Sequence, residues 1–156
     1  MRLSDFKFRG IGMPPERLKE IRKGLRTLHT LETMAVNIYK FQITKKVNEL
    51  NLQIIVAMHN EMTHLQDFQS KLFEYGFRPS PFRFVYWIVG FIFGFFPRLM
   101  GRKAILKTGI WVETKAVHHY EKLLVDIKWD EETRKIVEKN QADEFGHIER
   151  WESFLK

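Results

Sequence analysis

Apolar residues recur at helical spacing along most of the chain, and no stretch shows the alternation of a half-buried strand. The clearest stripe lies in the middle of the chain and predicts a helix that ends near Tyr75, with Gly76 as its C-cap. That stripe consists of Ile54, Met58, Met62, Leu65, Phe68 and Leu72. Similar spacing predicts helices over about 25–47, 103–127 and 131–154, the last of them capped by Asp130. The pattern therefore predicts an all-α protein.

The first 24 residues are predicted to form a basic N-terminal arm and a short helix. Pro14 and Pro15 open this helix, and Gly24 is expected to loosen it, so that residues 25–156 form the main domain. Residues 1–12 combine basic and aromatic side chains, which leaves two interpretations, a mobile tail and an arm that touches a membrane. They contain no apolar core of a signal peptide.

An uncharged aromatic run, FVYWIVGFIFGFF, occupies residues 84–96. It predicts a helix over about 83–99 that is closed by Pro97. As a helix the run would be roughly 20 Å long, whereas the core of a bilayer is about 30 Å thick. We therefore expect no transmembrane span. An aromatic helix with basic neighbours is typical of a monotopic surface that dips into an anionic leaflet, and the alternative is a buried core helix. The expected membrane contacts are Phe84, Trp87, Phe91 and Phe95, flanked by Arg83, Arg98 and Arg102.

Composition narrows the choice of partner and of chemistry. The net charge of +7 favours an anionic partner, either nucleic acid or an acidic membrane. Many of the 14 Phe and 4 Trp residues lie in one apolar block and not among basic residues, so we expect a membrane and no nucleic acid. There is no cysteine, which excludes disulfides and thiolate metal sites and leaves oxygen and nitrogen ligands. No serine nucleophile or phosphate-binding loop has a candidate.

Two Glu-x-x-His motifs carry the candidate chemistry. Glu61 and His64 lie one turn apart on the central stripe, and Glu144 and His147 repeat the arrangement near the C-terminus. A carboxylate that faces a core is costly unless it is paired or binds a metal. A di-iron carboxylate bundle is built from two such helices and one further Glu from each of two other helices.

A second repeat supplies these two glutamates. Residues 32–39 and 113–120 are identical at five of eight positions, beginning with Glu32 and Glu113 and ending with Tyr39 and Tyr120. The offset is 113 − 32 = 81, close to the 144 − 61 = 83 of the other motif. The chain is therefore interpreted as a duplicated helix pair, and the repeat strengthens the metal interpretation. Carboxylate and imidazole ligands suit iron or manganese better than a structural zinc ion.

Other side chains near these motifs are weaker candidates. Tyr39 and Tyr120 follow their glutamates by two helical turns and are either hydrogen-bond donors to the site or satisfied core tyrosines. Ala35 and Ala116 are small and are expected to leave room for a substrate. Three histidines are candidates for orienting ligands or relaying protons. They are His29, His118 and His119. His118 and His119 point away from the helix face of Glu113, which argues against a ligand role for either.

With these residues in place, residues 25–152 resemble the demethoxyubiquinone hydroxylase family of ferritin-like di-iron monooxygenases. The resemblance rests on the two Glu-x-x-His motifs, the Glu and Tyr pairs, and the Arg78-Pro79-Ser80 corner before the aromatic helix. It implies a ferritin-like four-helix bundle with an added membrane helix. It also implies six metal ligands, Glu32, Glu61, His64, Glu113, Glu144 and His147, with Glu61 and Glu144 bridging two irons. One departure is Leu31, where the family has Gly, so the pocket is expected to differ.

The resemblance implies hydroxylation of the ring of a polyprenyl benzoquinone in ubiquinone biosynthesis, with O₂ and NADH as co-substrates. It further implies a lipid-presenting helper protein, and the expected location is peripheral, on the cytoplasmic face of the cell membrane. The alternatives are a rubrerythrin-like di-iron oxidase or peroxidase and a non-enzymatic, membrane-associated iron-binding protein. The sequence leaves a homo-oligomer open.

Overall fold

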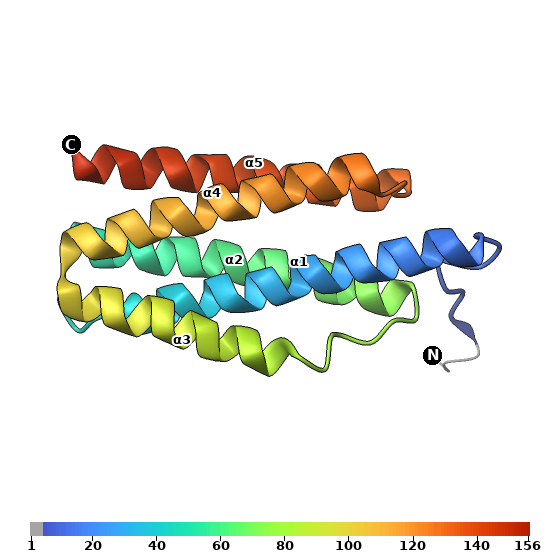
Figure 1. Ribbon diagram of the computed structural model, residues 1–156, viewed down its shortest axis with the longest axis horizontal. Coiled ribbons are helices and arrows are strands. Elements are labelled where there is room, and N and C mark those ends of the chain that lie inside the picture. The colour runs from blue at the N-terminus through green and yellow to red at the C-terminus, as the bar shows by residue number, and fades with distance from the viewer. Residues whose placement is uncertain (1–4) are drawn as a thin grey trace.

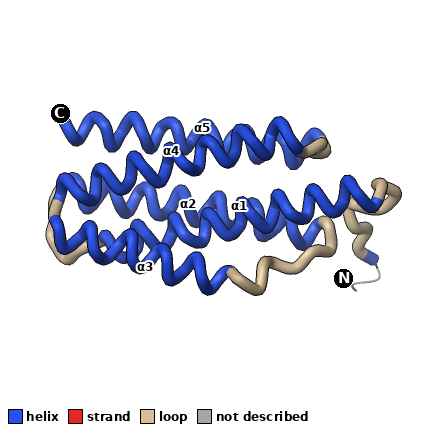
Figure 2. Tube along the Cα trace, in the orientation of Figure 1, coloured by secondary structure: helices blue, strands red, loops and turns tan. Residues whose placement is uncertain are grey.

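The computed structural model describes residues 5–156, and this part of the chain is all-α, as predicted (Figures 1 and 2). Its five helices are α1 (Pro15–Gln42), α2 (Glu49–Glu74), α3 (Arg83–Met100), α4 (Arg102–Asp126) and α5 (Glu131–Leu155). Both predicted caps are present: Asp130 begins α5, and Gly76 follows α2 with a φ of 76°. The side chain of Asn48 caps the start of α2 in the same way.

The four longest helices form a bundle of two antiparallel pairs, α1 with α2 and α4 with α5 (Figure 1). Two apolar clusters fill the bundle, one near each end. One cluster surrounds Leu25, Phe68 and Trp129. The other surrounds Ile54, Leu106 and Trp151. A polar cluster lies between them and is the subject of the next subsection.

α3 lies outside the bundle along α1 and also contacts α4 (Figure 1). Two buried glycines, Gly90 and Gly94, allow this close packing. A Cβ atom on Gly94 would lie 2.5 Å from the carbonyl oxygen of Ile38, and one on Gly90 would lie 2.8 Å from that of Met34. Only 17% of α3 is buried, so the alternative of a buried core helix is wrong. The opposite face exposes large apolar side chains, including Phe84, Trp87 and Phe96.

The predicted range of about 83–99 agrees with α3, but Pro97 does not close the helix. Pro97 is buried inside α3, and the helix continues to Met100 before Gly101 ends it with a φ of 97°. A proline removes one backbone donor but does not stop a helix that packing holds in place. The 18-residue helix is long and apolar enough to cross a membrane, which is weak evidence by itself. The length argument against a transmembrane span therefore no longer holds.

Two boundaries in the first helix were also predicted wrongly. α1 runs without a break through Gly24, because Trp129 and Ile127 pack against this glycine and leave no room for a side chain. It ends at Gln42 and not near residue 47. The amide of Thr44 donates to Oδ1 of Asn51 at 2.8 Å, and Nδ2 of Asn51 donates to the Thr44 carbonyl at 3.0 Å. These bonds hold the connecting loop in a non-helical conformation.

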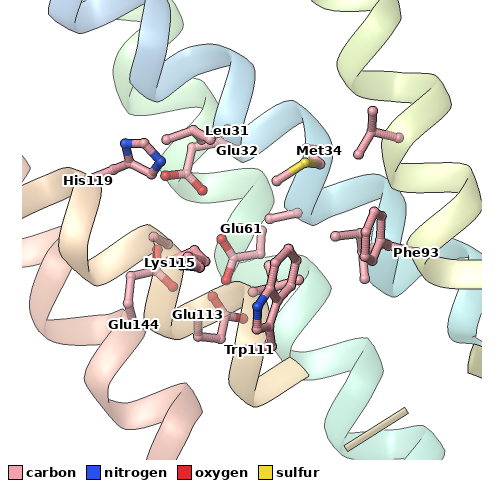
Figure 3. Close-up of a pocket in the computed structure, with 15 residues that line it drawn as sticks. Leu31, Glu32, Met34, Glu61, Phe93, Trp111, Glu113, Lys115, His119 and Glu144 are labelled. Carbon is pink, nitrogen blue, oxygen red and sulfur yellow. The ribbon is translucent and has the colours of Figure 1, made fainter. Parts of the chain in front are cut away.

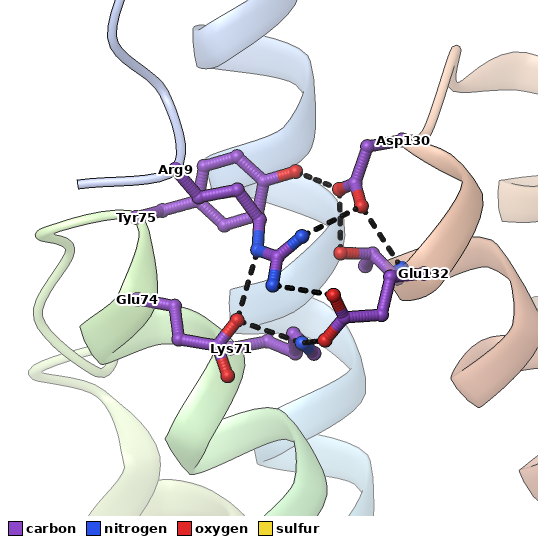
Figure 4. A network of polar contacts seen from close by, with 7 residues as sticks. Arg9, Lys71, Glu74, Tyr75, Asp130 and Glu132 are labelled. Atoms are coloured by element: carbon purple, nitrogen blue, oxygen red, sulfur yellow. Dashed lines mark hydrogen bonds and ion pairs between the residues drawn. The ribbon is translucent and has the colours of Figure 1, made fainter. Parts of the chain in front are cut away.

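Where the structure describes it, the N-terminal arm is tied to the bundle through Arg9, which contradicts a mobile tail, and its contact with a membrane stays a prediction. The interpretation of residues 1–4 lies outside the described part. The Arg9 guanidinium binds three carboxylates, on Glu74, Asp130 and Glu132, at 2.9, 3.2 and 2.7 Å (Figure 4). The same network includes Lys71, which pairs with Glu74, and Tyr75, which donates to Asp130. Arg9 therefore ties the arm to the end of α2 and the start of α5.

Candidate metal centre

The six predicted ligands come together in the middle of the bundle, and each is at most 3% exposed. α1 contributes Glu32, α2 contributes Glu61 and His64, α4 contributes Glu113, and α5 contributes Glu144 and His147. Each of them continues the buried stripe of its helix, so the packing that forms the bundle also brings the polar groups together. This set is therefore a product of the same helical spacing that predicted the fold.

The six side chains form two groups that could each hold a metal ion. One contains Glu32, Glu61, His64 and Glu144, and the other contains Glu61, Glu113, Glu144 and His147, with the ligand atoms of each group within 4.8 Å of one another. Glu61 and Glu144 belong to both groups.

The oxygens of the two shared carboxylates point to opposite sides. One oxygen of Glu61 lies 2.8 Å from Nδ1 of His147, and the other lies 3.5 Å from Nδ1 of His64. The oxygens of Glu144 lie 3.4 Å from Nδ1 of His147 and 3.2 Å from Nδ1 of His64. Each shared carboxylate therefore offers one oxygen to each of the two groups.

The donor atoms of this cluster fit a metal pair because most have no hydrogen-bond partner among the described residues. Folded proteins leave few buried polar atoms in this state. Here seven such atoms lie in one cluster. They are both carboxylate oxygens of Glu61 and of Glu144, Oε2 of Glu113, and Nδ1 of His64 and of His147.

Without metal, burial and crowding move the protons of the cluster. Burial raises the pKa of Glu32 to about 8, and burial together with the charges of Glu61 and Glu113 raises the pKa of Glu144 well above its ordinary value. For His147, burial lowers the pKa but the carboxylates of Glu113, Glu144 and Glu61 outweigh it and raise it to about 12. The metal-free site therefore holds protons where a metal pair would place positive charge.

Two tyrosines cross-link the halves of the repeat. Tyr39 donates its hydroxyl hydrogen to Glu113, and Tyr120 donates to Glu32. Each tyrosine therefore binds the glutamate of the opposite half and not the one seven residues before it. Burial raises the pKa of both hydroxyls, which keeps them protonated as donors. Trp151 adds a bond from Nε1 to the Tyr39 hydroxyl at 3.0 Å.

Asp143 was missed as a functional candidate. Its Oδ2 lies 3.0 Å from Nε2 of His64, so it fixes the ring with Nδ1 facing the cluster. Its position immediately before Glu144, within the motif, was the available signal. The other histidine candidates lie elsewhere: Nε2 of His29 bonds to Gln69 at 2.8 Å, and His119 is exposed and lines the pocket that leads to the cluster (Figure 3).

A pocket of about 250 Å³ leads to the cluster (Figure 3). Its walls are apolar, and its inner end carries the four glutamates. Ala35 and Ala116 line it, as their small size predicted, and so does Leu31. α3 contributes Val89 and Phe93, and the ring of Phe93 stacks on Trp111 with centroids 5.4 Å apart. The pocket therefore connects the aromatic helix with the candidate metal centre.

Comparison with known proteins agrees with this geometry. Residues 19–150 match the family described as Ubiquinone biosynthesis protein COQ7. A relative in Dictyostelium discoideum is named NADPH-dependent 3-demethoxyubiquinone 3-hydroxylase, mitochondrial. It is 28% identical over 140 residues, which cover 85% of this chain and 64% of that protein. The chain thus spans slightly less than two thirds of this relative. Because the family match covers most of its length, this protein belongs to the COQ7 family of ubiquinone biosynthesis, whose members are ferritin-like di-iron helical bundles.

Proposed function

We propose that this protein hydroxylates the ring of a polyprenyl benzoquinone of the demethoxyubiquinone type. The observation that carries the proposal is the apolar pocket that joins α3 to the four buried glutamates. A lipophilic tail would remain beside α3 while the ring reaches Glu61 and Glu144. Membership of the COQ7 family and the activity for which the Dictyostelium relative is named support the same substrate class.

We further propose that the cluster holds two iron ions. The ligands would be Glu32, Glu61, His64, Glu113, Glu144 and His147, an oxygen and nitrogen donor set that suits iron. When bound, the iron pair supplies the reduction of dioxygen that the hydroxylation needs. Asp143 holds His64 in position, and the tyrosines hold Glu113 and Glu32. The apolar walls of the pocket exclude water from the reacting ring.

We propose docking to an anionic membrane surface through the exposed face of α3. The aromatic contacts are the exposed Phe84 and Trp87 and the half-buried Phe91 and Phe95, of which Phe91 also packs against Phe41 of α1. The flanking cations are Arg83, Arg98 and Arg102. α3 lies along α1 over much of its length. A transmembrane orientation would bring the charged flank of α1, such as Lys40, into the bilayer at high cost. An orientation of α3 in the plane of the membrane avoids that cost. The proposed location is the cytoplasmic face of the cell membrane.

The reductant in this proposal is NADH. The name of the relative specifies NADPH for that protein, so both nucleotides need to be compared. A lipid-presenting helper protein belongs to the same proposal, since a polyprenyl quinone leaves the bilayer only at a cost of about 0.8 kcal/mol for each exposed methylene group.

The decisive experiment supplies iron-loaded protein with isotopically labelled dioxygen, either nucleotide and a short-tail demethoxyquinone. Mass spectrometry should find one labelled oxygen on the ring, and Glu61→Ala and Glu144→Ala should lose both iron and product. Nucleotide oxidation that yields only water or peroxide would favour the rubrerythrin-like alternative. Absence of any turnover with two irons bound would favour the non-enzymatic one.

Sedimentation with vesicles tests the membrane part separately. The wild-type protein should sediment with anionic vesicles, and serine at Trp87, Phe91 and Phe95 should weaken this binding. Failure of the wild type to sediment at low salt would contradict docking through α3.

A further inference from the structure

The ends of α1 and α3 and the starts of α2 and α4 lie at the same end of the bundle (Figure 1). Residues from these segments line a second pocket, of about 150 Å³. Three of its lining residues are cationic: Lys46 from the loop after α1, Arg98 from α3, and Arg102 from α4. No carboxylate is among the residues that line it. The pocket therefore favours an anion, and it is separate from the metal centre.

Gln42 is the buried polar group of this pocket. It is 1% exposed, and neither its amide nitrogen nor its amide oxygen has a hydrogen-bond partner among residues 5–156. Leaving a buried amide unpaired is costly, so the amide favours a polar partner inside the pocket. The neighbouring Asn51 differs, because its side chain already bonds to Thr44.

The first turn of α4 adds backbone donors to the same pocket. Gly101 precedes the helix with a φ of 97°, and no side chain caps the helix. An uncapped helix N-terminus attracts anions through its free N–H groups and its dipole. Arg102 also lines the pocket, and its guanidinium is held at the end of α5, where it donates to the Phe154 carbonyl at 3.1 Å and its carbon lies 5.3 Å from the centre of the Phe154 ring.

We propose that this pocket binds a phosphate group, either in a phospholipid headgroup or as free phosphate. Its chemistry is that of a tetrahedral oxyanion site: guanidinium and ammonium groups, an amide donor and helix N–H groups. The end of α3 beside the pocket exposes Phe96, Leu99 and Met100 by 53, 66 and 77%, which offers an apolar surface for lipid chains. The site is independent of the proposed hydroxylation, and it would fix one end of α3 at a lipid headgroup.

The test measures thermal unfolding of the iron-loaded protein with inorganic phosphate and with a soluble short-chain phosphatidic acid. At least one of the two should raise the midpoint of the wild type. Gln42→Leu keeps the charge and the buried volume but should weaken the binding roughly two- to tenfold, the effect of one lost hydrogen bond. Arg98→Gln should weaken it about fivefold. Its matched control, Lys103→Gln, removes the same charge from an exposed neighbour outside the pocket and should have little effect.

The two ligands distinguish the sources of the phosphate. A Gln42-dependent effect of inorganic phosphate assigns the site to free phosphate, and an effect of phosphatidic acid alone assigns it to a lipid headgroup. Equal responses of the wild type and Gln42→Leu, or equal losses in Arg98→Gln and Lys103→Gln, would overturn the proposal, since diffuse charge attraction would then suffice. If Gln42→Leu fails to fold, the arginine and lysine pair still decides.

Discussion

Tyr120 on α4 donates its buried hydroxyl hydrogen to Glu32 on α1, and through this bond the second half of the repeat holds a candidate metal ligand of the first. Tyr39 makes the reciprocal bond to Glu113. The two bonds hold the two carboxylates that belong to only one candidate group each, and these flank the shared pair, Glu61 and Glu144. The duplicated sequence thus builds one site that neither half could form alone.

Replacing Tyr120 by Phe should weaken iron binding without unfolding the protein. The change leaves Oε1 of Glu32 without its hydrogen-bond donor. Loss of a side chain that hydrogen-bonds to a metal ligand lowers the affinity for the metal by about ten- to 100-fold. Anaerobic titration with ferrous ion measures the effect. Tyr39→Phe is the matched variant and should cost more stability, because it also removes the acceptor of Trp151. If both variants bound iron with wild-type affinity, the two hydroxyls would have no role in orienting the ligands.

Asp143→Asn should weaken the ion held by His64 more than the ion held by His147. The carboxylate lies 3.0 Å from Nε2 of His64 and fixes which ring nitrogen faces the cluster, whereas an amide fixes it less strongly. The titration should therefore separate into a tight and a weak step. Asp67→Asn is a control at a partly exposed aspartate on α2, and it should leave one step. A uniform loss at both ions would contradict a local role for Asp143.

The metal-free protein should lose stability as the pH rises, and the iron-loaded protein should not. Folding raises the pKa of Glu32 from 4.5 to about 8, so its contribution is present below about pH 4.5 and is lost towards pH 8. The pKa of His147 rises from 6.5 to about 12, so its contribution declines as the pH rises above 6.5. Metal displaces these protons, so metal binding strengthens with pH.

Denaturant unfolding of both forms across this pH range checks the prediction. The unfolding free energy of the metal-free form should fall between about pH 4.5 and 8, and the difference between the two forms should widen. Glu32→Gln serves as the control, since it cannot titrate and should flatten part of the slope. Parallel pH profiles for the two forms would contradict proton displacement at this cluster.

Helical spacing predicted both the helices and the set of six candidate ligands, because each prediction depends on which residues share a helix face. The errors came from contacts between distant residues. Gly24 does not break α1, since Trp129 covers it, and Pro97 does not end α3. The mobile-tail interpretation of the N-terminal arm failed because the three carboxylate partners of Arg9 lie 65 to 123 residues away along the chain. The crossed bonds of the tyrosines could not be predicted from the repeat for the same reason.

Leu31→Gly should widen the pocket and raise turnover of quinones with bulky ring substituents. Leu31 lines the pocket beside Glu32, so its removal enlarges the space near the glutamates. Glycine inside a helix costs about 1 kcal/mol relative to alanine, so stability must be measured with the rate. Ala35→Leu is the opposite variant: it should narrow the pocket and lower turnover while iron content stays unchanged. Equal selectivity in all three proteins would mean that this wall does not contact the ring.

Gly94→Ala should displace α3 from α1 and leave the metal cluster in place. The added methyl group would lie 2.5 Å from the carbonyl oxygen of Ile38 and 2.8 Å from Cβ of Phe41, so one of the two helices must move. The cluster itself involves only the four bundle helices, and iron content should be retained. Because Val89 and Phe93 on α3 form part of the pocket wall, turnover of long-tail quinones should fall more than turnover of short-tail ones. Hydrogen exchange should increase over residues 83–100.

Gly146→Ala is the matched control, since nothing lies within 4 Å of its added methyl group, and it should stabilise α5 by about 1 kcal/mol. If Gly94→Ala lost iron, α3 would instead be required to hold the bundle around the cluster.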